Sequence, residues 1–165
     1  MGYNLPRLIY NSRMNSVSAE LPQVISAAEA VLQQVSEEQS RKPILAGGWS
    51  AKQVLGHLID SASNNHQRFV RAALQGSLDF PAYDQQGWVL VQAVEEAPWP
   101  SLVALWASYN RHLAHVIAHL PPTQLKAACR IGSGEPVTLQ FLVEDYLRHL
   151  LHHLAQLGAV PANRP

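Results

Sequence analysis

The sequence has too little of several features to belong to some large classes of protein. It contains a single cysteine, Cys129, so no disulfide can form within the chain. Its 12 lysines and arginines are balanced by 12 aspartates and glutamates, which leaves no excess positive charge to hold a nucleic-acid backbone. No apolar run approaches the length of about 18 residues that a membrane-spanning helix needs. We therefore expect neither a nucleic-acid partner nor a membrane partner.

Targeting signals are also missing from the first residues. Residues 1–18 contain a proline and several polar or charged side chains, and they lack an apolar stretch long enough for a signal peptide. With one cysteine, nothing in the sequence requires an oxidising compartment. The sequence therefore predicts a cytoplasmic protein.

The composition that is present suits a folded domain. The 165 residues are the usual size of one domain, and 47% of them are apolar, which is enough for a sizeable core. We predict a single domain over residues 1–165, in which residues 1–17 form a lead-in arm before the first helix.

Four segments repeat apolar residues at helical spacing. They predict helices near residues 20–38, 50–75, 100–120 and 138–157. The second helix has the clearest signals, because Ser50 and Gln53 form a capping box at its start and Gly76 is suited to end it. Pro22 suits the first turn of the first helix, and Thr138 is a good N-cap for the fourth.

The connection between the second and third helices, residues 77–98, is unusually long. We expect it to cross one end of the bundle, with Tyr83, Asp84 and Trp88 covering the core or the cleft. No segment shows the alternation of a strand. The sequence therefore predicts an all-α four-helix bundle with a long crossover between its second and third helices.

Histidine is abundant, with eight residues, and three of them fall on faces that should point inward. His149 and His153 lie four residues apart on the apolar stripe of the fourth helix, so their side chains should be neighbours. His57 lies on the inner side of the second helix. Three imidazoles from two facing helices could hold one metal ion and leave coordination positions open. The alternative is a set of hydrogen-bonded core histidines.

A second group of histidines competes with this interpretation. His112, His115 and His119 could also share one face of the third helix, but that face lies on the flank of its apolar stripe. We therefore expect a half-exposed polar surface there. A zinc-protease motif is excluded on the fourth helix, because no glutamate lies between His149 and His153.

Several polar residues near these histidines have two readings. Asp60 follows His57 by one turn and Asp145 precedes His149 by one turn, so each could accept the second ring N–H or remain a surface carboxylate. Asn64 could lie on a pocket wall, two turns after His57.

Two further residue types near these positions are expected to have ordinary roles. Arg68 and Arg71 continue the second helix, and we expect them to be solvated rather than bound to an anionic substrate. Cys129 is expected to be structural rather than a nucleophile, since no histidine or lysine partner can be placed beside it.

Two stretches resemble signatures of the DinB/YfiT-like superfamily. Residues 48–60, GWSAKQVLGHLID, are similar to its second-helix signature, and residues 145–157, DYLRHLLHHLAQL, are similar to its fourth-helix signature. In that family, a Trp-Ser start precedes a helix with one metal-binding histidine, and a later helix supplies two more. The matching positions here are His57, His149 and His153, and the resemblance spans about residues 20 to 157.

The resemblance implies an up-down-down-up bundle, often dimeric, that holds zinc, nickel or another divalent ion. Characterised members include metal-dependent transferases and isomerases that use low-molecular-weight thiols. We therefore expect a homodimer and a metal-dependent transferase that acts on a small molecule with a thiol cosubstrate. The alternatives are a metal-dependent hydrolase and a non-catalytic metal-binding bundle with a stress-response or interaction role.

Overall fold

The computed structural model describes residues 5–160, and their side chains from residue 16 onward. Its four long helices are α1 (Leu5–Leu32), α3 (Ala51–Gln75), α5 (Trp99–Ala118) and α6 (Leu139–Gln156). Short helices α2 (Glu37–Ser40) and α4 (Gln85–Val91) and a 3-10 helix, η1 (Pro122–Gln124), lie in the connections. No helix within residues 5–160 has the length and apolar content needed to cross a membrane.

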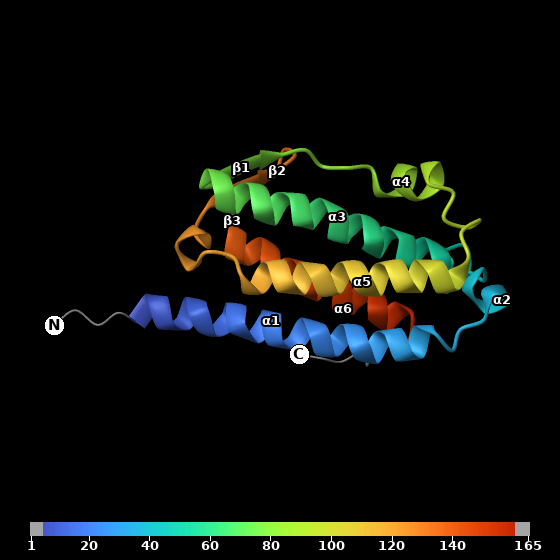
Figure 1. Cartoon of the computed structure of the whole chain (residues 1–165). Helices are drawn as coiled ribbons and strands as arrows, with labels where there is room; N and C mark the ends of the chain where they lie inside the picture. Colours follow the sequence, from blue (N-terminus) through green and yellow to red (C-terminus); the bar gives the residue numbers. More distant parts are fainter. Residues whose placement is uncertain (1–4, 161–165) are drawn as a thin grey trace.

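The long helices form the predicted four-helix bundle with up-down-down-up directions. In Figure 1, α1 runs from left to right, α3 and α5 both run back, and α6 runs in the direction of α1. Helices α1 and α3 each pack against both α5 and α6. The fold class is confirmed, and it places α3 directly beside α6.

A small sheet sits at one end of the bundle, where no strand was expected. Strand β1 (Ser77–Phe80) pairs in parallel with β2 (Ala128–Ile131), which pairs antiparallel with β3 (Val137–Thr138). Strands of two to four residues are too short to show an alternating pattern, which is why the sequence did not reveal them. The sheet joins the end of α3 to the start of α6.

The first helix differs from its prediction at both ends. It begins by Leu5, so the described part of the expected lead-in arm is helical, and residues 1–4 lie outside the described residues. Pro22 lies inside the helix rather than in its first turn. The helix ends at Leu32, well before Glu38, because Ser36 and Gln39 form a capping box that starts α2.

The long connection between α3 and α5 runs lengthwise beside α3 rather than across one end of the bundle (Figure 1). Gly56 on α3 makes the close approach possible, since a Cβ there would lie 2.8 Å from Val94 Cγ1. This segment therefore covers one side of α3 and supplies residues to the cavities described below.

The core is built mainly of leucines and large aromatic side chains. Trp99, Trp106 and Phe69 are fully buried, and Trp99 Nε1 donates a hydrogen bond to the Leu32 carbonyl at 2.9 Å. Leu105 on α5 is 53% exposed, although Leu102 and Trp106 beside it are buried. The buried apolar side chains of α1, α3, α5 and α6 form one core that holds the four long helices together.

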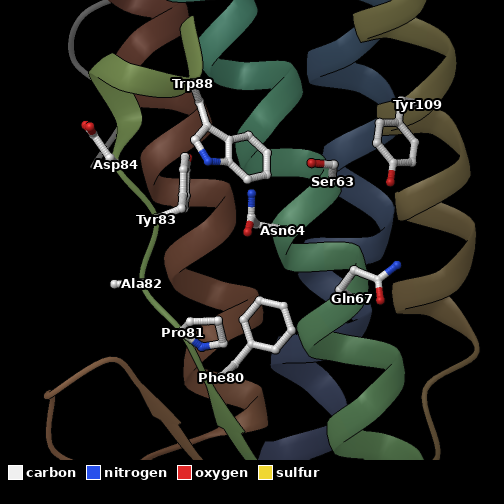
Figure 2. A pocket seen from close by; sticks show the side chains of 10 residues that line it. All are labelled: Ser63, Asn64, Gln67, Phe80, Pro81, Ala82, Tyr83, Asp84, Trp88 and Tyr109. Atoms are coloured by element: carbon white, nitrogen blue, oxygen red, sulfur yellow. The ribbon is translucent and has the colours of Figure 1, made fainter. Parts of the chain in front are cut away.

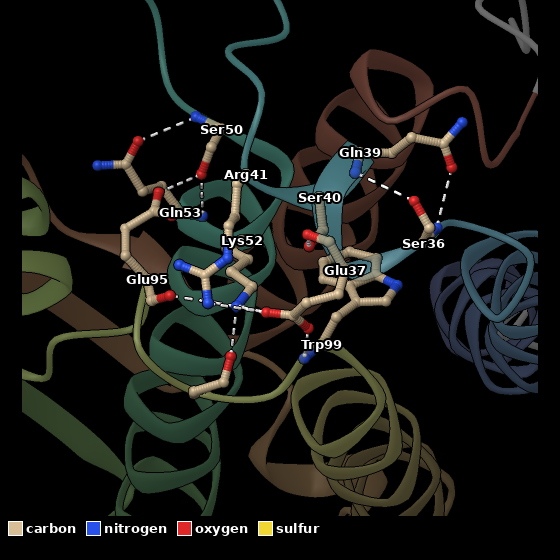
Figure 3. Close-up of polar contacts among 11 residues, drawn as sticks. Ser36, Glu37, Gln39, Ser40, Arg41, Ser50, Lys52, Gln53, Glu95 and Trp99 are labelled. Atoms are coloured by element: carbon tan, nitrogen blue, oxygen red, sulfur yellow. Dashed lines mark hydrogen bonds and ion pairs between the residues drawn. The ribbon is translucent and has the colours of Figure 1, made fainter.

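A buried lysine, Lys52, connects several elements at the end of the bundle where α3 begins (Figure 3). Lys52 Nζ donates to the Glu37 carboxylate and to the carbonyls of Glu95, at 3.1 Å, and Ala97, at 2.6 Å. Glu37 also accepts from the Trp99 N–H at 2.8 Å. The hydrogen bond from Lys52 is the main reason that the pKa of Glu37 is lowered to about 2. These contacts connect α2, the start of α3 and the start of α5.

Candidate metal centre

His57, His149 and His153 meet between α3 and α6. Ser50 caps α3, accepting a hydrogen bond from the Gln53 N–H, and this cap fixes where the helix begins. One ring nitrogen from each histidine lies within 4.8 Å of those of the other two. His57 Nε2 and His149 Nε2 are 3.0 Å apart. The structure thus brings together the three histidines that the sequence singled out.

The surroundings of the three rings favour neutral imidazoles. His57 is 1% exposed, and the other two are partly buried. Burial, and then repulsion from the other two rings, lowers the pKa of His57 to about 4. Burial is also the main cause of the lowered pKa of His149, about 4, and of the lowered pKa of His153. The neutral ring is the form that binds a metal.

Two polar residues contact the outer nitrogens of this group. His153 Nδ1 lies 2.8 Å from Gln156 Oε1, an oxygen that can only accept, so Nδ1 carries the proton and Nε2 keeps its lone pair. His149 Nδ1 lies 3.4 Å from Ser61 Oγ. Such contacts orient metal-binding histidines in proteins generally. Neither contact could be predicted from the sequence, because each depends on side-chain packing.

The donor set fits a divalent transition metal. Imidazole nitrogens suit zinc, nickel and related ions, and no lysine or arginine among the described residues hydrogen-bonds to the three rings. His57 Nδ1 is buried without a hydrogen-bond partner in the described part of the chain. The Trp49 ring packs against the His57 ring in a T-shaped arrangement, with ring centroids 5.5 Å apart. A pocket of neutral rings with an unsatisfied polar atom is therefore present.

Asp60, Asn64 and Asp145, the polar residues that lie near the histidines in sequence, have different surroundings in the structure. Asp60 is buried and accepts from Gln92 Nε2 at 2.9 Å, rather than from His57, and burial raises its pKa. Asn64 donates to the Asp60 carbonyl at 3.0 Å. Asp145 forms an ion pair with Arg148 and lines a cavity together with His149.

That cavity opens beside the histidine group. Its volume is about 250 Å³, and its wall includes Arg68, Tyr83, Asp145, Tyr146 and His149. It is shared between α3, α6 and the long connection. A small molecule in this cavity would contact His149 directly.

A second hollow of about 610 Å³ lies on α3 and is lined by Asn64 and by aromatic side chains of the connection (Figure 2). Figure 2 shows Asn64 between Trp88 and Phe80, with Tyr109 contributed by α5. No histidine lines it. Tyr83 borders both hollows, and burial raises its pKa to about 12. Asn64 is therefore on a pocket wall, but on that of the second hollow.

The competing histidines on α5 are arranged differently. His115 and His119 have ring centroids 4.2 Å apart and are both exposed, and His119 Nδ1 lies 2.7 Å from the His115 carbonyl. His112 instead packs against His66. In residues 16–160, the group on α3 and α6 is the one set of three or more potential ligands that converge.

Cys129 lies in the small sheet, away from this centre. Its side chain is fully buried in β2, and burial raises the pKa of its thiol. Its Sγ lies 3.4 Å from the Ala127 carbonyl. A buried thiol with a raised pKa is unreactive, which agrees with the structural role expected for it.

The chain is similar to known proteins over most of its length. A family model described as the DinB superfamily matches residues 20–157. A Bacillus licheniformis protein is 30% identical over 141 residues, which cover 85% of this chain and 78% of the relative. The YfiT protein of Bacillus subtilis is 28% identical over 143 residues, which cover 86% and 78%. Both relatives are provisionally named metal-dependent hydrolases.

The solved structure of YfiT from Bacillus subtilis shares the fold. Its TM-score with this chain is 0.81 at 22% sequence identity, and the match covers 89% of this chain and 85% of that one. It is described as a four-helix bundle of unusual topology. The likeness agrees with the up-down-down-up order of the long helices.

Proposed function

The chain belongs to the DinB superfamily, and on that premise we propose that it is a metal-dependent enzyme acting on a small molecule. In this proposal His57, His149 and His153 hold one divalent ion, zinc or nickel. The observation that carries it is the convergence of three ring nitrogens within 4.8 Å of one another.

Three protein ligands favour catalysis over a purely structural metal. A structural zinc site usually has four protein ligands, whereas a catalytic site leaves a position for water or substrate. A bound divalent ion supplies a nucleophile at neutral pH, because it lowers the pKa of a water or thiol attached to it. The cavity beside His149 gives a small molecule access to that position.

The surrounding residues have supporting roles in this proposal. Gln156 and Ser61 hold the rings of His153 and His149 in place through the contacts at their outer nitrogens. Leu142 and Tyr146 are buried and form part of the cavity wall. The chain thus contributes binding, orientation and a partly apolar environment.

Two nucleophiles are compatible with this arrangement. A low-molecular-weight thiol would make the protein a transferase. The positions of the two nearby carboxylates favour this candidate, because neither is placed to act as a general base. Asp145 is paired with Arg148 and Asp60 with Gln92, so neither hydrogen-bonds to the histidines as a ready general base. A thiol is far more acidic than water, so a thiol bound to the ion depends less on such a base to lose its proton. Water would make the protein a hydrolase, and the names of the two relatives favour that candidate.

Cobalt substitution distinguishes the two nucleophiles. We expect the cobalt-loaded protein to develop a sulfur-to-cobalt charge-transfer band when a small monothiol is added, and to catalyse addition of that thiol to an electrophile. His149→Ala should remove both signals, and His115→Ala should keep them. Ester hydrolysis without a charge-transfer band would favour the hydrolase. A loaded protein that binds neither thiol nor an exchangeable water would contradict the proposal of an enzyme.

A further inference from the structure

Arg68, a partly buried cation on α3, forms no ion pair within the described residues. The Arg68 side chain is partly buried, and its Nε is fully enclosed without a hydrogen-bond partner. One terminal nitrogen reaches Asn65 Oδ1 at 3.5 Å, and the guanidinium lies 5.7 Å from the centre of the Phe80 ring. No carboxylate within residues 16–160 forms an ion pair with it. The Asp145 carboxylate acts on Arg68 through space but is ion-paired with Arg148, so the guanidinium, which remains charged even when buried, has no directly bonded anion.

Arg68 lies on the same face of α3 as the candidate metal ligand His57. Between them, Ser61 touches His149 Nδ1, and Asn65 Nδ2 lies 3.4 Å from Ser61 Oγ. Arg68 lies eleven positions after His57, which is about 16 Å along a helix. Helical side chains lean toward the N-terminus of their helix, and the Asn65 contact shows that the guanidinium does so. The charge is thus directed back toward the histidines.

The cavity of about 250 Å³ connects the two positions. Both Arg68 and His149 line it, together with Leu142, Ile131 and Tyr83. Its wall combines apolar side chains with several polar ones, and such polar groups fix how a small molecule is oriented in a pocket. One cavity therefore offers both a fixed positive charge and a member of the histidine group.

We propose that Arg68 binds the carboxylate of the substrate, so that the protein acts on small carboxylic acids. That this carboxylate belongs to a substrate rests on the proposed function, but carboxylate binding at Arg68 needs no metal. A carboxylate fits because the planar guanidinium can donate two parallel hydrogen bonds to it. Phosphate fits less well. Asp145 lines the same cavity, and its carboxylate would repel the second negative charge that a phosphate carries and a carboxylate ligand does not.

Binding of a simple carboxylate to the metal-free protein tests this proposal. Butyrate, its neutral isostere butyramide and inorganic phosphate are titrated at constant ionic strength into nitrogen-15-labelled full-length protein. We expect butyrate to shift the Arg68 Nε–H resonance in a saturable way and butyramide to leave it unchanged. Arg68→Gln should weaken butyrate binding about tenfold or more, since a charge-assisted pair is lost.

Matched variants separate this site from general effects of charge. Arg71 is an exposed arginine three residues further along α3, so Arg71→Gln should bind butyrate as the wild type does. Arg68→Lys keeps the charge but loses the planar fork, and we expect intermediate affinity. No saturable shift, equal affinity for butyramide, or equal or tighter binding of phosphate would overturn the proposal.

The same titration keeps this inference apart from the proposed function. His153→Ala should still bind butyrate, because the carboxylate contact does not involve that ring. A protein that binds metal through its histidines but shows no Arg68-dependent butyrate binding would refute only the inference. A protein that binds butyrate but no metal would refute only the proposed function.

Discussion

At the scale of single residues, the centre depends on imidazoles that stay uncharged. His57 is enclosed by Trp49 and by two other histidines, and burial is the largest cause of its lowered pKa. One ring nitrogen of each of the three histidines lies within 4.8 Å of those of the other two, and a neutral ring can offer a lone pair to a metal. The arrangement is thus better suited to holding a cation than to packing alone.

Residue spacing predicted part of this centre. His149 and His153 could be paired from the sequence because a separation of four is one helical turn wherever a helix forms. Ser61 and Gln156 could not be assigned their contacts, since these depend on ring orientation. Arg68 was expected to be solvated but is half buried, because the chain after α3 returns along that helix and covers it.

The ion pair between Glu37 and Lys52 predicts a measurable pH dependence. The pKa of Glu37 is about 2 in the folded protein and 4.5 ordinarily, so its contribution to stability is complete above pH 4.5 and disappears as the pH falls toward 2. Urea unfolding between neutral and acidic pH should therefore show that Glu37→Gln is destabilised relative to wild type at pH 7, and that this difference shrinks below pH 4.5. The exposed Glu38→Gln is the control. A difference that stays constant over this range would show that the pair does not titrate in this way.

At the scale of elements, the sequence predicted the helix caps correctly but not the position of Pro22 within its helix or the short strands. The caps at Ser50 and Thr138 are confirmed, because each needs only a few neighbouring residues. Pro22 was misread, since a proline favours a first turn but can also lie within a long helix whose remaining turns are well packed. The small sheet escaped notice because its stability comes from pairing with distant segments rather than from local pattern.

Gly56 predicts how tightly the long connection packs on α3. Replacing a helical glycine by alanine normally stabilises a protein by about 0.5–1 kcal/mol. Here the added Cβ would lie 2.8 Å from Val94 Cγ1, and overpacking typically costs about 1–3 kcal/mol. We therefore expect Gly56→Ala to lower the free energy of unfolding by about 1 kcal/mol or more in chemical denaturation.

A double variant checks the cause of that loss. Val94→Ala removes both methyl groups that approach Gly56, so adding it to Gly56→Ala should recover part of the lost stability. If Gly56→Ala were neutral or stabilising by itself, the connection would not lie as close to α3 as the structure places it.

At the scale of the whole molecule, topology explains why two distant segments form one centre. The order up-down-down-up places α6 beside α3, although 63 residues lie between the end of α3 at Gln75 and the start of α6 at Leu139. The apolar stripes predicted this bundle without the directions of its helices, which the family resemblance supplied. A metal ion held by both helices would join elements that are far apart in sequence, so it should also stabilise the fold.

Assembly is a separate prediction. The formal net charge of zero gives weak repulsion between copies, and Leu90 and Val91 on α4 expose 71% and 88% of their surfaces. We expect a homodimer in sedimentation equilibrium at micromolar concentrations. A single species with the mass of one chain, 18.2 kDa, at all concentrations would contradict this expectation.

Metal binding by single-histidine variants tests the central claim most directly. Zinc is titrated calorimetrically into the wild type and into His57→Ala, His149→Ala, His153→Ala and His115→Ala, with circular dichroism to confirm that each variant remains helical. We predict one zinc ion per chain for the wild type and for His115→Ala, and loss of most of the affinity in the other three variants. Zinc binding that survives in those three variants and disappears in His115→Ala would place the site on α5 and contradict this account.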